Sequence, residues 1–217
     1  YKLKRALGMD ASDPMENLTW YNKEMEDCAN DYAAYILEIV EAAKESCADP
    51  KVPIEQRVDF SRWVEQDFGT ADCVIIADGT LRICDYKHGL GVLVDATYNP
   101  QMKCYALGAL ELFDDIYDID NVSMTIYQPR RQNISTFEIS KDDLYKRANE
   151  VLKPTADLAF AGAGNFLCGE WCGFYKAKHE CRARAEANLT LAQYDFKLPP
   201  LLENSEIEYI LSRADEL

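Results

Sequence analysis

Two aspartates and a lysine, at the ends of two β-rich runs, are the residues in this sequence best suited to chemistry. The segment 69–87 contains both runs, separated by Asp-Gly at positions 78–79, and this dipeptide between such runs is a strong hairpin signal. A two-residue turn pairs positions whose numbers add up to 157, so Asp72 faces Asp85, with Lys87 two residues further along. The spacing predicts two opposed carboxylates beside an ammonium group.

The hairpin face that carries these charges is predicted to be buried. Because side chains alternate between the faces of a strand, Asp72, Asp85 and Lys87 share a face with four aliphatic residues. These are Val74, Ile76, Leu81 and Ile83. One lysine offsets only one of two facing carboxylates, so a divalent ion such as Mg²⁺ or Mn²⁺ would complete the arrangement and support phosphoryl chemistry. The alternative is a solvent-exposed hairpin end with an ordinary Asp-Lys salt bridge.

A helix shortly after the hairpin is predicted to carry two further site residues. Asn99-Pro100 is typical of a helix start, and Gln101 and Tyr105 are spaced i, i+4, so both project from one side of the helix. Together with the backbone N–H groups of the helix start, they form a plausible phosphate-binding surface. In the alternative interpretation Tyr105 belongs to the core and Gln101 to the surface.

The elements around the hairpin predict one α/β domain in which helices flank a mixed sheet. Hydrophobic periodicity and turn residues define these elements. Helices are expected at about 17–47, 101–113 and 141–161, the last capped by glycines at 162 and 164, with a short basic helix after 181 and a final one from about 205. The further strands are expected near 58–60, exposed or at a sheet edge, and at 121–128 and 134–139.

Composition restricts the class of protein. The 217 residues are 48% apolar and 28% charged, which fits a folded globular protein, and no apolar run is long enough to span a membrane. The net charge of −15 repels nucleic acids at long range, so a polyanionic substrate must be drawn in by a local site. Five of the eight cysteines (28, 47, 73, 84 and 104) lie in apolar segments, as buried reduced thiols of a cytoplasmic protein would.

Three ordered motifs resemble those of a known family. Gly-x-x-Asp72, Asp85-x-Lys87 and Gln101-x-x-x-Tyr105 are similar to the signatures of the RecB-like branch of the PD-(D/E)XK nucleases. The sequence that flanks these motifs resembles that of a phage-associated group of RecB-like exonucleases. This resemblance covers about residues 1–190. The resemblance implies a restriction-endonuclease-like core, a central mixed β-sheet flanked by helices, within a single nuclease domain over 1–217. A cysteine-bearing helical extension is expected over 165–217.

The resemblance also implies roles for the site residues. Asp72 and Asp85 would bind Mg²⁺ or Mn²⁺, the Tyr86 carbonyl would add a backbone ligand, and Lys87 would be the catalytic lysine. Gln101 and Tyr105 would contact DNA or support the site, and Arg130 and Arg131 are candidates for gripping the DNA backbone.

One departure from the family concerns a metal-binding histidine that its members usually carry before the first strand. The histidines here are His88 and His179, and His88 is expected to be a surface residue on the face opposite Lys87. The missing histidine is therefore expected upstream of Tyr1, which would make this chain a fragment with an incomplete metal site.

A second departure lies in the cysteine stretch. Many RecB-like exonucleases hold a [4Fe-4S] cluster with C-x2-C-x5-C and one distant cysteine. The middle position of that spacing is Tyr175 here, and tyrosine is a poor cluster ligand. Cys168, Cys172 and Cys181 therefore fit a degenerate cluster or a zinc site, and the alternative is a loop that packs without metal.

The function expected from these residues is metal-dependent exonucleolytic hydrolysis of DNA, in phage recombination or end processing. The alternative is a non-catalytic protein that uses the same fold to bind DNA or a phage recombinase. A small-molecule enzyme on an unrelated α/β fold would leave the Gln101 and Tyr105 spacing unexplained.

Overall fold

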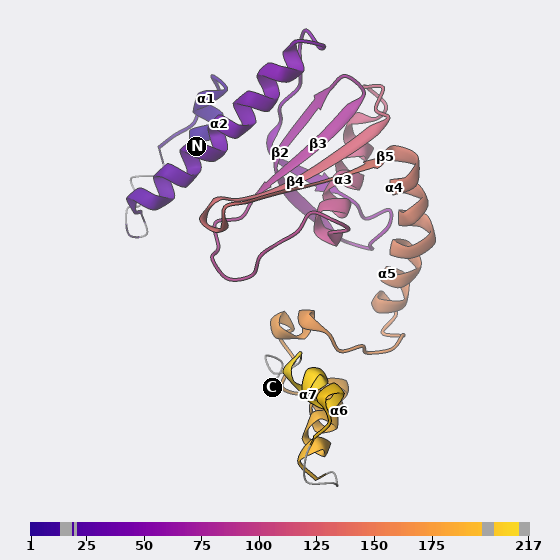
Figure 1. Ribbon diagram of the computed structural model, residues 1–217. Coiled ribbons are helices and arrows are strands. Elements are labelled where there is room, and N and C mark those ends of the chain that lie inside the picture. The colour runs from indigo at the N-terminus through magenta and orange to yellow at the C-terminus, as the bar shows by residue number, and fades with distance from the viewer. Residues whose placement is uncertain (14–18, 20, 197–201, 213–217) are drawn as a thin grey trace. The chain divides into compact units, whose positions relative to one another are not determined.

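Five strands form one mixed β-sheet, and their order in the sheet is the same as their order in the chain (Figure 1). The computed structural model describes residues 1–13, 19, 21–196 and 202–212. The strands are β1 (Ile54–Asp59), β2 (Phe68–Ala77), β3 (Thr80–Tyr86), β4 (Asn121–Gln128) and β5 (Asn133–Ser140). Neighbouring strands are antiparallel except β3 and β4, which are parallel. Parallel neighbours need a crossover connection, and α3 (Pro100–Phe113) lies within it.

The β2–β3 hairpin has the predicted register. Ala77 pairs with Thr80, and the pairing continues without slippage to Cys73 and Cys84. The two turn residues, Asp78 and Gly79, have φ of +50° and +66°, as a two-residue turn with both central residues left-handed requires. The local sequence thus determines how these two strands align.

Helices cover both faces of the sheet. On one face, α3 and α4 (Lys141–Arg147) pack on a core that contains Val74, Ile76, Leu81 and Ile83 of the hairpin, as predicted. On the other face, α1 (Lys2–Ala6) and α2 (Lys23–Lys44) cover the opposite side chains. These include the buried Cys73, Ile75 and Cys84. The helical and strand content confirms a mixed α/β fold with a five-stranded sheet between helices.

The helix boundaries follow their caps. The Asn22 side chain caps α2 by accepting a hydrogen bond from the Met25 N–H, so this helix begins at Lys23 and not at the predicted residue 17. Residues 17, 18 and 20 of the predicted helix 17–47 lie outside the described residues. The Asn99 side chain caps α3 in the same way, with Pro100 as its first residue, which confirms the predicted start. The predicted helix 141–161 consists of α4, a π-helical segment (Ala148–Leu152) and α5 (Lys153–Phe160), followed by left-handed glycines at 162 and 164.

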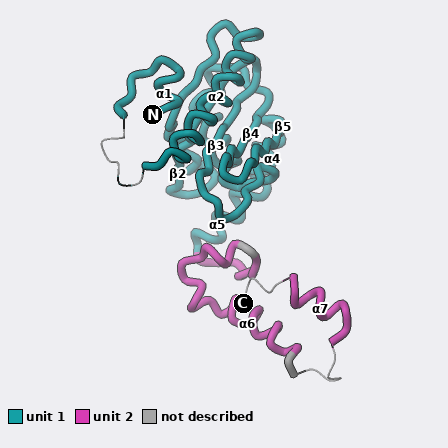
Figure 2. Tube along the Cα trace, turned by 60° about the vertical axis from the view of Figure 1, so that its left-hand side comes forward, with its two compact units in different colours: residues 1–161 teal, residues 162–217 magenta. Residues whose placement is uncertain are grey.

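The chain divides into two compact units, residues 1–161 and 162–217 (Figure 2). The predicted extension from 165 falls within the second unit, which contains α6 (Arg182–Ala192) and α7 (Asn204–Leu211). β1 is an edge strand, as predicted, although Val58 within it is fully buried. Among the described residues, no helix combines the length and apolar composition needed to cross a membrane.

Candidate functional site

Asp85 and Lys87 stand at the carboxyl end of the central strand β3. Strands lie on both sides of β3, and the Asp85 side chain is consequently buried, with 3% of the residue exposed. The Lys87 ammonium lies 2.8 Å from Asp85 Oδ2 as an ion pair. No other described residue donates a hydrogen bond to that oxygen. Burial raises the pKa of Asp85, and Lys87 opposes this rise.

Lys87 is linked to the helix α3 through one hydrogen bond, which a second hydrogen bond within α3 extends. Its Nζ donates to Gln101 Oε1 at 3.2 Å, and Gln101 Nε2 donates to the Tyr105 hydroxyl at 2.9 Å. Tyr105 is half-buried against the core and Gln101 is exposed, so both earlier interpretations of this pair apply in part. The structure therefore connects Asp85, Lys87, Gln101 and Tyr105 in one chain of contacts.

Gly69 joins the first motif to this chain. A Cβ atom built at Gly69 would lie 2.3 Å from Cε1 of Tyr105, which is closer than any side chain tolerates. The Tyr105 ring thus packs directly on the backbone at Gly69, where only glycine leaves it room. Three motifs that are separate in the sequence meet around this ring.

Asp72 lies next to this chain of contacts but not in the way that strict alternation predicts. Its Oδ2 accepts a hydrogen bond from the Tyr86 N–H at 2.8 Å. Ala71 and Val74, three residues apart, pack in the same core, so alternation is broken at Asp72. Asp72 lines a cavity of about 290 Å³ together with Leu3 and Tyr32 from the α1–α2 side of the sheet. The expected placement of Asp72 on the face of Val74 is corrected accordingly.

Electrostatics nevertheless couple Asp72 to the charges of β3. Burial raises the pKa of Asp72, the hydrogen bond from the Tyr86 N–H opposes the rise, and the negative charge of Asp85 adds to it. Lys87 lowers the pKa of Asp72 and Glu55 raises it. The charges of Asp85 and Lys87 thus both act on Asp72 at the end of the hairpin, although Asp72 does not lie on the face where the sequence predicts it.

Glu55 is a site residue that the sequence did not reveal. The pairs Ile54–Cys73 and Gln56–Ala71 place it opposite Asp72, and it lines the same cavity. Its φ of +55° is unusual for a residue with a side chain, and it lies where alternation is broken on the neighbouring strand. The Glu55 carboxylate pairs with Lys4 of α1, and this hydrogen bond lowers the pKa of Glu55. No sequence motif indicates that Glu55 belongs to the site, because its place opposite Asp72 depends on how β1 aligns with β2.

The remaining candidates lie around the same end of the sheet or in the second unit. Arg130 and Arg131 are in a turn (Pro129–Arg131) just beyond the carboxyl end of β4, the parallel neighbour of β3. Arg130 pairs with Glu24 at 2.9 Å, and Arg131 donates to the Leu90 carbonyl at 3.1 Å. His88 is half-buried and hydrogen-bonded to the Tyr86 hydroxyl at 3.0 Å, so it lies on the face opposite Lys87, as predicted, but is not fully exposed.

The three cysteines of the second unit line one cavity of about 420 Å³ whose walls include several aromatic rings. None of the eight cysteines forms a disulfide, and Cys28, Cys73 and Cys84 are buried as expected, whereas Cys47 and Cys104 are only half-buried. In the described ranges no three His, Cys, Asp or Glu side chains gather closely enough to hold a metal ion. Cys168, Cys172 and Cys181 therefore share a cavity without forming a ligand group.

A family model described as "Protein of unknown function (DUF2800)" matches residues 1–217. The chain belongs to the DUF2800 family. A solved structure titled "Crystal structure of SSO0001" is similar to 84% of this DUF2800 chain and 93% of its own, at 13% sequence identity and a TM-score of 0.36. A similarity this distant carries no argument about the site.

Proposed function

We propose that this chain is a metal-dependent deoxyribonuclease with a restriction-endonuclease-like core and a reaction centre at Asp85 and Lys87. The observation that supports this best is the buried Asp85 carboxylate, whose Oδ2 has the Lys87 ammonium 2.8 Å away and no other donor among the described residues. Buried carboxylates are costly unless an equal positive charge compensates them. Lys87 contributes one positive charge, while Asp72 adds a second negative charge nearby. The two carboxylates of Asp72 and Asp85, with one ammonium group beside them, can therefore accommodate a further cation.

The donor set suits Mg²⁺ or Mn²⁺ better than a closed structural metal site. Mg²⁺ is usually bound through one or two carboxylates and retains waters and substrate phosphate oxygens as its other ligands. Asp72, Asp85 and the Tyr86 carbonyl would hold such an ion, and a group of three acidic or histidine side chains is not required. When bound, the ion polarises the scissile phosphate and lowers the pKa of a bound water.

The protein's own residues supply positioning and charge. The Lys87 ammonium is held between Asp85 Oδ2 and Gln101 Oε1, so it is oriented before substrate arrives. From this place it stabilises negative charge that develops on phosphate oxygens, or donates a hydrogen bond to the attacking water. Gln101 is itself held by the Tyr105 hydroxyl and acts as a positioning residue.

The proposed substrate is linear DNA, cleaved exonucleolytically in phage recombination or end processing, with a phage recombinase as a partner. Arg130 and Arg131, beyond the neighbouring strand end, are the proposed contacts to the DNA backbone. Such a local site is needed because the net charge of −15 repels a polyanion. The proposal that Cys168, Cys172 and Cys181 bind an iron–sulfur cluster or zinc is supported by their common cavity alone, since the described structure does not gather them into a ligand group.

The test is degradation of end-labelled linear DNA, single- and double-stranded, with Mg²⁺, with Mn²⁺ and with EDTA. We expect cleavage only with a metal ion and none in Asp85→Asn, since an amide keeps the shape but loses the charge. Lys87→Ala should lower the rate roughly 10²–10⁴-fold while metal binding persists. Undiminished cleavage by Asp85→Asn would refute the mechanism.

A non-catalytic role in binding DNA or a recombinase is the second candidate. The observation that favours it is the closed Asp85–Lys87–Gln101 chain, which satisfies Lys87 without any substrate. This role predicts DNA binding that is unaffected by EDTA and by Asp85→Asn, with no cleavage of any DNA. Metal-dependent cleavage excludes it.

A further inference from the structure

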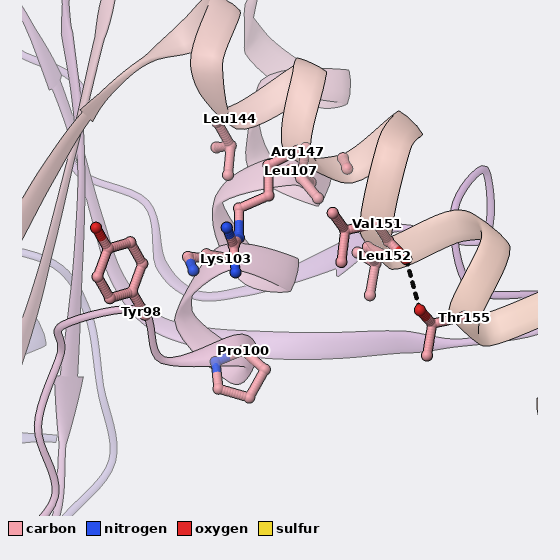
Figure 3. Close-up of a pocket in the computed structure, with 10 residues that line it drawn as sticks. Tyr98, Pro100, Lys103, Leu107, Leu144, Arg147, Val151, Leu152 and Thr155 are labelled. Carbon is pink, nitrogen blue, oxygen red and sulfur yellow. Dashed lines mark hydrogen bonds between the residues drawn. The ribbon is translucent and has the colours of Figure 1, made fainter. Parts of the chain in front are cut away.

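A second site lies on another side of α3, in a cavity of about 190 Å³ between that helix and the α4–α5 segment (Figure 3). Lys103 and Leu107 of α3 line it, and at 3.6 residues per turn Lys103 points about 200° around the helix from Gln101. The cavity is therefore separate from the contacts of Lys87. Most of its walls are aliphatic, including Leu144 and Val151.

Two cations face this cavity without an acidic partner. Lys103 is only 7% exposed, and its Nζ lies 4.7 Å from the centre of the Tyr98 ring and 5.8 Å from that of Phe137. The Arg147 guanidinium lies 5.5 Å from the same Tyr98 ring. Figure 3 shows the nitrogens of Lys103 and Arg147 close together beside Tyr98. Within the described part of the chain, neither forms an ion pair with an acidic side chain.

The electrostatic environment of Lys103 is unfavourable for its positive charge. Burial lowers the pKa of Lys103, and the positive charge of Arg147 lowers it further. Three carboxylates, those of Glu138, Asp143 and Glu150, line a neighbouring hollow that also includes Arg147, but no ion pair joins them to it. The buried Lys103 is repelled by the exposed guanidinium of Arg147, and an anion bound between the two would offset that repulsion.

The backbone around the cavity is irregular on both sides. Tyr98 has a φ of +56°, in the left-handed region that non-glycine residues seldom occupy. Opposite it, the helix widens into the π-helical segment Ala148–Leu152, whose Ala148, Val151 and Leu152 line the cavity. The Thr155 hydroxyl of α5 donates to the Val151 carbonyl of this segment at 2.7 Å (Figure 3). Strained backbone and π-bulges are both enriched at functional sites.

We propose that this cavity binds a phosphate monoester carried on an aromatic or apolar group, with Lys103 and Arg147 as its phosphate ligands. A phosphate monoester carries a charge close to −2 at neutral pH and so matches the two cations, whereas a carboxylate matches only one. The aliphatic walls contact the organic group, for which there is room, since cavities of about 150 Å³ hold a benzene ring. Arginine and lysine are both established phosphate ligands.

The test is isothermal titration calorimetry of the whole chain in the presence of EDTA, so that no divalent ion can carry phosphate to Asp72 and Asp85. The ligands are phenyl phosphate, inorganic phosphate, benzoate and phenol. We expect phenyl phosphate to bind at one site, and inorganic phosphate and benzoate each at least tenfold more weakly. Phenol, which lacks the anion, should not bind measurably.

Three variants locate the site. Lys103→Met and Arg147→Met should each weaken phenyl phosphate binding at least tenfold. Lys146→Met, one position along the same helix but outside this cavity, should change it less than twofold. Arg147 is exposed, so Arg147→Met keeps the test valid if Lys103→Met does not fold. The proposal would be overturned by an absence of saturable binding, by cavity variants that both bind phenyl phosphate as tightly as the unmodified chain, or by tighter binding of benzoate than of phenyl phosphate. All these readings are independent of nuclease activity.

Discussion

The proposed metal site makes a quantitative prediction for Asp85→Asn, tested by thermal unfolding with and without Mn²⁺. A ligand that binds only the folded protein stabilises it by about 2.7 kcal/mol at a free concentration of 100 times its Kd. For a domain of 150–250 residues, 1 kcal/mol corresponds to about 2–4 °C in Tm. The first unit, residues 1–161, is in this range, so Mn²⁺ should raise its Tm by about 5–11 °C.

In Asp85→Asn this shift should fall below about 1 °C, since the amide retains the shape of the side chain but not the charge that holds the ion. The variant also leaves Lys87 without its ion pair, and Lys87 is partly exposed and can be hydrated instead. The shift caused by Mn²⁺, rather than the absolute Tm, is therefore the quantity to compare.

Asp78→Asn is the matched control, because it makes the same chemical change in the same hairpin. Asp78 is exposed in the turn with φ of +50°, a conformation that asparagine also adopts, and it is remote from the strand end. Its Mn²⁺ shift should equal that of the unmodified chain. An equally large shift in Asp85→Asn would show that Mn²⁺ binds elsewhere and would remove the main support for the proposed function.

Two further variants test packing and charge elsewhere in the fold. Gly69→Ala should lower the free energy of unfolding by about 1–3 kcal/mol in a urea titration, because the new Cβ would overlap the Tyr105 ring. Gly91→Ala is the control, since a Cβ at Gly91 has nothing within 4 Å, and it should change this free energy by less than about 0.5 kcal/mol. Lys103→Met should raise Tm at neutral pH, since the folded chain no longer buries this ammonium group. Because the pKa of Lys103 is lowered on folding, the folded chain binds fewer protons than the unfolded one between this lowered pKa and the ordinary value of 10.5, so stability rises with pH in that range. The advantage of Lys103→Met should consequently shrink between pH 7 and pH 10, and an advantage that grows with pH would contradict this account.

Local signals in the sequence determined the elements that carry the site. Asp78-Gly79 sets the β2–β3 register because a two-residue turn allows only one alignment of the strands that it joins. Asn99 and Pro100 set the start of α3, and with it the positions of Gln101 and Tyr105. Each of these signals acts over a few residues, so it can be read without knowledge of the rest of the chain.

Only the tertiary structure decided which distant residues meet. Glu55 faces Asp72 through the alignment of β1 with β2, whose connection of eight residues (60–67) specifies no register. The break in alternation at Asp72 likewise depends on both strands together. Lys103 and Arg147 share a cavity because α4 docks beside α3, although 44 positions separate the two residues. Long-range packing of this kind is a sum of many weak apolar contacts, and no short pattern in the sequence encodes it.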